Sequence, residues 1–134
     1  MTGRDRFTLC IGQQLRLQLE KQAKLDGRHL QQQVLYLLEV MLAVAREIPS
    51  FRLKPERQER TEPGLAIKLC LTDWLNEQTF HLAGYYGLTQ QQFMRTMLWM
   101  GLDWCERVCP KDQVLSKEDF LIAVLAMLKP VPVQ

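Results

Sequence analysis

Few residues of this chain have the types and spacing needed for catalysis. His29 and His81 are the only histidines, and we expect His29 to be a helix cap or a surface residue rather than a general base. The sequence contains neither a glycine-rich phosphate-binding loop nor a serine nucleophile elbow. We therefore predict that the protein is not an enzyme, has no catalytic residues and needs no cofactor.

The four cysteines could in principle bind a metal ion. Cys105 and Cys109 are one helical turn apart, but no nearby His or Cys completes a set of four ligands. We expect both to be small apolar residues near a helix end, with no metal site and with all thiols reduced in a cytoplasmic protein. Cys10 and Cys70 alternate with apolar residues, so we expect them to point away from the core.

These last two cysteines belong to an internal repeat, whose copies span Arg6–Arg46 and Ala66–Arg107 without gaps. Internal repeats are diagnostic of architecture and are sought first. Identical residues at the constant offset include the pairs Leu9/Leu69, Cys10/Cys70, Leu15/Leu75, Gln18/Gln78, Ala23/Ala83, Gly27/Gly87, Gln31/Gln91, Gln32/Gln92, Leu38/Leu98 and Leu42/Leu102.

Each copy predicts a strand followed by two helices. The strand is indicated by apolar residues that recur with period two, which gives one buried and one free face. The first helix is amphipathic, with its apolar positions every four residues, and the second is apolar nearly all round and therefore buried. The residues behind these predictions are Phe7, Leu9, Ile11 and Ile67, Leu69, Leu71 for the strands, Leu15, Leu19, Ala23 and Leu75, Thr79, Ala83 for the first helices, and Leu30 and Gln90 as the starts of the second helices.

Helix ends are also marked in the sequence. Thr72 and Asp73 offer an N-cap to the first helix of the second copy. Gly27 and Gly87 supply the left-handed residue that commonly ends a helix.

The repeats are joined by a predicted linker, residues 47–64, in which prolines interrupt a run of alternating bases and acids. We favour a solvated tether over a basic strap that touches phosphates, because the acids nearly balance the bases. After the second repeat, Ser116 and the acids behind it predict a C-terminal helix over residues 116–129. We expect this helix to cover apolar surface of the core; the alternative is a face for self-association or for a partner protein.

Composition sets broad limits. A chain of 134 residues is one domain by size, and its net charge of +2 permits nucleic-acid binding without requiring it. Neither a signal peptide nor an apolar run long enough for a membrane span is evident. We therefore expect a cytoplasmic protein that does not enter a membrane.

The strand–helix–helix order with a glycine in the turn resembles the ribbon-helix-helix family of transcriptional repressors, the MetJ, Arc and CopG type. Members are normally homodimers in which each chain gives one strand, whereas this chain carries both halves, as in the tandem TraY-like arrangement. The implied fold is mostly helical with a two-stranded antiparallel ribbon, an intramolecular pseudo-dimer of repeats at residues 6–46 and 65–108, plus the extra C-terminal helix. With the pseudo-twofold axis near Thr8 and Lys68, Thr8 faces Lys68, Cys10 faces Ala66 and Arg6 faces Cys70.

The resemblance implies a DNA-binding protein, either a transcriptional regulator or a DNA-processing accessory factor. In this family the outward face of the ribbon reads bases in the major groove, and the N-terminus of the second helix of each repeat contacts a phosphate. Because the two strands differ, the expected double-stranded DNA site is asymmetric. The alternative is a ribbon-helix-helix scaffold that has lost DNA binding and serves as a protein-interaction module. Carried over by position, the base-contacting residues are Arg6, Thr8, Cys10, Ala66, Lys68 and Cys70, and the phosphate-contacting residues are Arg28, His29, Leu88 and Thr89.

Overall fold

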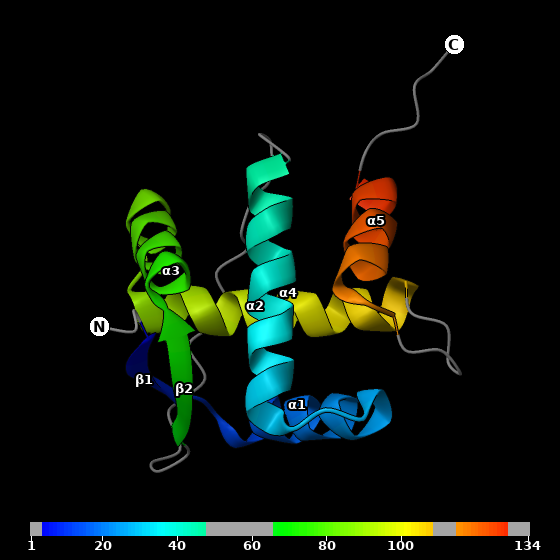
Figure 1. Cartoon of the computed structure of the whole chain (residues 1–134), viewed down its shortest axis with the longest axis horizontal. Coiled ribbons are helices and arrows are strands. Elements are labelled where there is room, and N and C mark those ends of the chain that lie inside the picture. Colours follow the sequence, from blue (N-terminus) through cyan, green and yellow to red (C-terminus); the bar gives the residue numbers. More distant parts are fainter. Residues whose placement is uncertain (1–3, 48–65, 109–114, 129–134) are drawn as a thin grey trace.

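The computed structural model describes residues 4–47, 66–108 and 115–128, and within them the chain is mostly helical with one two-stranded antiparallel sheet (Figure 1). This confirms the expectation of a mostly helical chain with a two-stranded antiparallel ribbon. All but the first residue of the predicted linker 47–64 lies outside the described residues, as does Cys109. The elements in chain order are β1 (Arg4–Cys10), α1 (Gln13–Asp26), α2 (Leu30–Glu47), β2 (Ala66–Thr72), α3 (Asp73–Tyr85), α4 (Gln90–Val108) and α5 (Lys117–Leu128).

The ribbon pairs two segments that are far apart in sequence. Thr8 lies opposite Lys68, and the neighbouring pairs are Arg6 with Cys70 and Cys10 with Ala66. This is the register predicted from the sequence. The first strand, however, runs from Arg4 to Cys10 and not from Arg6 to Ile11, and Gly12 follows as the N-cap of α1.

The ribbon has one buried and one exposed face. Leu9 is buried in β1. In β2 the buried side chains are those of Ile67, Leu69 and Leu71. The alternate residues, among them Arg6, Thr8 and Lys68, are exposed. The period-two pattern therefore places the apolar side chains on the helices and leaves the polar ones on the outside.

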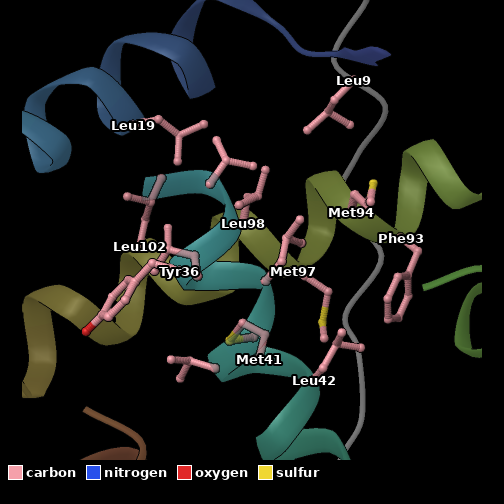
Figure 2. Close-up of a cluster of buried hydrophobic side chains, with 14 of the residues drawn as sticks. Leu9, Leu19, Tyr36, Met41, Leu42, Phe93, Met94, Met97, Leu98 and Leu102 are labelled. Atoms are coloured by element: carbon pink, nitrogen blue, oxygen red, sulfur yellow. The ribbon is translucent and has the colours of Figure 1, made fainter. Parts of the chain in front are cut away.

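The long helices α2 and α4 cross at the centre of the molecule and form most of the core (Figures 1 and 2). Gly101 of α4 lies at this crossing. A Cβ atom there would be 3.2 Å from Leu37 Cδ2 and 3.5 Å from Met41 Cγ. Glycine therefore lets α4 approach α2 closely, and Leu37 and Met41 of α2 occupy the space that a side chain at position 101 would need.

The two helical hairpins end their first helices in the same way. Gly27 and Gly87 have left-handed backbones, with φ of 68° and 72°. In both, the amide that follows the glycine donates to the carbonyl of an alanine, from Arg28 to Ala23 at 2.9 Å and from Leu88 to Ala83 at 2.8 Å. These bonds satisfy carbonyls that the helix leaves without partners.

The C-terminal helix α5 covers α2 and α4, as expected for a helix that buries apolar surface of the core. Phe120 and Val124 are fully buried against them, and Ser116 caps the helix by accepting from the Asp119 amide at 3.2 Å.

At the edge of the same contact, Lys117 Nζ and Glu39 Oε2 lie 2.5 Å apart, and this hydrogen bond raises the pKa of Lys117. A lysine whose pKa rises on folding stabilises the native state below its ordinary pKa, and that contribution disappears as the pH rises through the folded value. The pair is about half exposed, so we expect its contribution to be small.

None of the helices in the described part is both long enough and apolar enough to span a lipid bilayer.

We predict opposite stability effects for alanine at two exposed glycines. A Cβ would meet nothing within 4 Å at either Gly27 or Gly84, so packing does not enter the comparison. Gly27→Ala should lower the free energy of unfolding by about 1–2 kcal/mol, because an L-residue is strained at positive φ. Gly84→Ala should raise it by up to about 1 kcal/mol, because alanine is the better helix former. Urea denaturation of the two variants measures both, and equal effects would contradict the assigned backbone conformations.

Candidate nucleic-acid interface

The outward face of the ribbon carries all the residues that the sequence assigned to base contact. Every one of them is exposed, and they lie on one face as three cross-strand pairs. The central pair is Thr8 and Lys68, flanked by Arg6 with Cys70 on one side and by Cys10 with Ala66 on the other. The structure thus brings together in one strip residues that are up to 64 positions apart in sequence.

The chemistry of this strip differs between its two ends. One end carries the Arg6 guanidinium and the centre carries the Lys68 ammonium, while the other end carries only Cys10 and Ala66. None of the outward residues assigned to base contact is acidic. The strip can therefore donate hydrogen bonds at one end and the centre, and can make only small, weakly polar contacts at the other end.

The outer edge of β1 is closed by side chains from α4. Gln91 Nε2 donates to the Thr8 carbonyl at 2.7 Å, and Gln91 Oε1 accepts from the Cys10 amide at 2.9 Å. Arg95 Nη1 adds a bond to the Cys10 carbonyl at 3.0 Å. The Gln91 amide thus satisfies an edge that would otherwise be open to another strand.

These bonds also show whether Thr8 and Lys68 form a hydrogen-bonded or a non-hydrogen-bonded pair. The N–H and C=O groups of one strand residue point to the same side, so the polar groups of Thr8 and Cys10 point away from β2. Thr8 and Lys68 therefore form a non-hydrogen-bonded pair, the arrangement in which facing side chains come closest together. Their side chains are presented side by side at the middle of the strip.

The outer edge of β2 is different. Gln31 occupies in the first repeat the position of Gln91 in the second, but it is exposed, and no side chain in the described part of the chain makes an equivalent bond to Lys68 or Cys70. Leu35, at the position that corresponds to Arg95, carries no charge. A cation therefore flanks the ribbon on the β1 side, with no counterpart at the equivalent position beside β2.

The N-terminus of α4 has a complete capping box. Thr89 Oγ1 accepts from the Gln92 amide at 3.1 Å, and Gln92 Oε1 accepts from the Thr89 amide at 3.0 Å. At the start of α2 only half of this arrangement is present, with Gln32 Oε1 accepting from the His29 amide at 3.0 Å. In each helix the first-turn amides that remain have no intrahelical partner and can face an anion.

His29 and Thr89 are exposed at these helix starts, whereas Leu88 is half-buried and offers only its backbone. Arg28 is half-buried, and its guanidinium is engaged by neighbouring groups of the protein. Its guanidinium donates to Asp26 at 3.0 Å and to the Leu115 carbonyl at 3.3 Å, and it lies 3.8 Å from the centre of the Tyr36 ring. We therefore leave Arg28 out of the candidate interface.

Sequence reasoning missed Gln91 and Arg95. Gln91 carried a signal, since it is one of the identical repeat positions and has no apolar role to explain the identity. Arg95 carried no such signal, because the residue at the corresponding position of the first repeat is Leu35. Its role depends on a hydrogen bond to the carbonyl of Cys10 in the distant strand β1.

No protein-family model, curated protein or solved structure is detectably similar to this chain. Among the described residues, no group of three or more His, Cys, Asp or Glu side chains could hold a metal ion. Cys105 is buried, while Cys10 and Cys70 are exposed.

We predict that Cys10 and Cys70 do not form a disulfide within one molecule. Cys10 lies opposite Ala66, four residues from Cys70 along β2, which corresponds to about 13 Å. A disulfide requires Cα atoms within about 7 Å of each other. Mild oxidation followed by non-reducing peptide mapping tests this, with the reduced protein as control. Recovery of an intramolecular Cys10–Cys70 peptide would show that the ribbon register is wrong.

Proposed function

We propose that this chain is a tandem ribbon-helix-helix protein that binds double-stranded DNA by placing its ribbon in the major groove, as a transcriptional regulator or a DNA-processing accessory factor. The observation that carries the proposal is the exposed ribbon strip, which is centred on Lys68 and Thr8 and contains no acid among its outward residues. A two-stranded ribbon fits the major groove in width, and its outward side chains can then reach base edges.

Three features support the tandem arrangement. The buried residues of α1 are Leu15, Leu19 and Ala23. The residues 60 positions later in the chain are the buried residues of α3. Gly27 and Gly87 close both hairpins with the same hydrogen bonds. The strand register is centred on the pair that the repeat makes equivalent, Thr8 and Lys68.

Base recognition follows from the chemistry of the strip. Arg6 and Lys68 can donate to the O6 and N7 acceptors of guanine, and Thr8 can hydrogen-bond a base or contact a thymine methyl group. Cys10 and Ala66 suit only small apolar contacts, such as a thymine methyl group. The preferred site is therefore asymmetric, with its guanines beneath the Arg6 end and the centre of the ribbon.

Phosphate contacts on both flanks of the ribbon would fix its register. The free first-turn amides of α2 and α4 are suited to this role, together with the His29 side chain and the Thr89 cap. Arg95 adds a cation next to the ribbon on the α4 side. We expect this flank to hold the DNA backbone more strongly than the α2 flank.

The tandem arrangement predicts the behaviour of an isolated repeat. A fragment of residues 1–60 has one strand without a partner and an α2 whose buried face packs on α4 in the full chain. We expect the fragment either to be unfolded or to form a homodimer in which two copies of β1 pair. Sedimentation and circular dichroism measure this, and a well-folded monomeric fragment would contradict the tandem arrangement.

Lys68→Ala should weaken DNA binding. If Lys68 contacts a base, the loss should be about 1–3 kcal/mol and should relax the preference at one position of the site. If Lys68 contacts only phosphate, binding should weaken evenly across sequences, and the salt slope should fall by about one. Fluorescence anisotropy against duplexes selected from a random library, and against scrambled duplexes, distinguishes the two at two salt concentrations.

Arg107→Ala is the control, because it removes an exposed positive charge in the last turn of α4, where Arg107 pairs with Asp103 at 3.2 Å. Figure 1 shows this end of α4 away from the ribbon. The substitution should leave affinity and salt slope unchanged. Equal and negligible duplex binding by the wild type and both variants would refute the DNA proposal.

That outcome would favour the second candidate function, a scaffold that binds another protein. The observation that supports this candidate is the outer surface of α3, where Phe80 and Tyr85 are 63% and 80% exposed. Exposed aromatic residues of this size are typical of protein contact surfaces.

A further inference from the structure

The outer face of α3 is unusually apolar for an exposed helix. Phe80 and Tyr85 project from it, and Trp74 at its start is 47% exposed. The His81 ring packs edge-on against Phe80 at a centroid distance of 5.9 Å. The charged residues of α3 are Asp73 and Glu77, both exposed and both acidic. This aromatic, acidic surface is called the α3 face below.

The corresponding surface of α1 has complementary chemistry. Leu17 and Leu25 are 55% and 64% exposed, two helical turns apart. Lys21 lies between them and Lys24 lies beside Leu25, both exposed. These four residues share one side of the helix, since positions three and four apart lie together. Exposed Glu20 borders this side one turn before Lys24, and it is paired with Arg16 at 2.8 Å. This mainly aliphatic and basic surface is called the α1 face below.

We infer that copies of this protein associate head to tail, with the α3 face of one copy packed on the α1 face of the next. In an antiparallel arrangement that sets Leu17 beside Tyr85, both Lys24 and Leu25 come beside Glu77. Apolar side chains then meet apolar side chains at one end, while opposite charges meet at the other.

Charge decides between this partner and a symmetric one. Two α3 faces packed together would bring Asp73 and Glu77 of both copies close. The helix itself contributes no Lys or Arg to balance them, although Arg46 of α2 lies 5.7 Å from the centre of the Trp74 ring. Two α1 faces would bring Lys21 and Lys24 of both copies together. Like charges opposed in this way cost affinity, whereas the α3–α1 combination pairs them with opposite charges.

The arrangement within one molecule keeps both faces available. No residue contacts are found between α1 and α3, and the two helices lie in different parts of the fold (Figure 1). A contact that joins two different surfaces does not satisfy itself in a dimer, and it continues to a third copy unless the rotation closes a ring. The inference therefore predicts species larger than a dimer, and it requires no DNA.

The test uses full-length chains in which one face at a time is made polar. Leu17→Gln with Leu25→Gln removes the α1 face, and Phe80→Gln with Tyr85→Gln removes the α3 face. All four side chains are exposed and glutamine favours helix, so both variants should remain folded. Circular dichroism checks this.

Sedimentation velocity over a concentration series, without DNA, gives the expected results. The wild type should grow beyond a dimer, and each double variant alone should associate at least about tenfold more weakly. An equimolar mixture of the two variants should form a one-to-one dimer that does not grow, since each contributes the one face that the other lacks.

Two further variants separate this contact from general stickiness. Ile122→Gln with Met127→Gln removes apolar side chains of α5 that are 64% and 37% exposed, and should leave association unchanged. Lys24→Glu and Glu77→Lys should each weaken association, and a chain that carries both changes should recover it because the charges are exchanged.

Several results would overturn the inference. A wild type that stays monomeric throughout the series would do so and would leave the α3 face to a different partner. An α1-face variant that still dimerises, with an α3-face variant that does not, would show a symmetric α3 contact. Failure of the mixed variants to form a dimer would also overturn it, whereas loss of DNA binding by Lys68→Ala bears only on the proposed function.

Discussion

The fold depends on the pairing of two short strands that neither half of the chain can satisfy alone. A single strand leaves backbone N–H and C=O groups unpaired along both edges. Pairing β1 with β2 satisfies one edge of each strand and positions Leu9 and Leu69 over the helices. The helices in turn bury the inner face of the ribbon, so the outward face can be polar without any loss of core.

The two halves of the structure differ where they meet other elements. At the helix crossing, Met41 corresponds in the repeat to Gly101, so that a large and a small side chain share one space. Buried Gln33, which accepts a hydrogen bond from Arg28 at 3.2 Å, corresponds to Phe93, which stacks on Tyr86. A protein built from two identical chains could not combine such pairs, because each substitution would occur on both sides.

Two polar side chains of the first hairpin help to hold α5 in position. Arg28 and Tyr36 both donate to the Leu115 carbonyl, at 3.3 Å and 3.1 Å, just before the helix begins. Their repeat counterparts, Leu88 and Thr96, have no comparable long donor. The fifth helix is thereby anchored through one hairpin, although it covers both α2 and α4.

The secondary structure and the strand register could be predicted because their causes are local or periodic. The alternation around Leu9 and Leu69, the glycine turns and the Thr72 cap are all written in neighbouring residues. The surroundings of the ribbon could not be predicted in this way. The bonds from Gln91 and Arg95 span more than eighty residues, and the inward turn of Arg28 depends on a carbonyl eighty-seven residues away. Local pattern contains no information about such partners.

The order of the strands has a consequence for synthesis of the protein. β1 is made before β2, which lies about 60 residues further along the chain. At about 5–20 residues per second, several seconds pass on the ribosome before β2 exists. During that interval the apolar side of β1 and much of α2 have no native surface to pack against. Until the second half is made, the first half therefore exposes apolar surface that the complete fold buries.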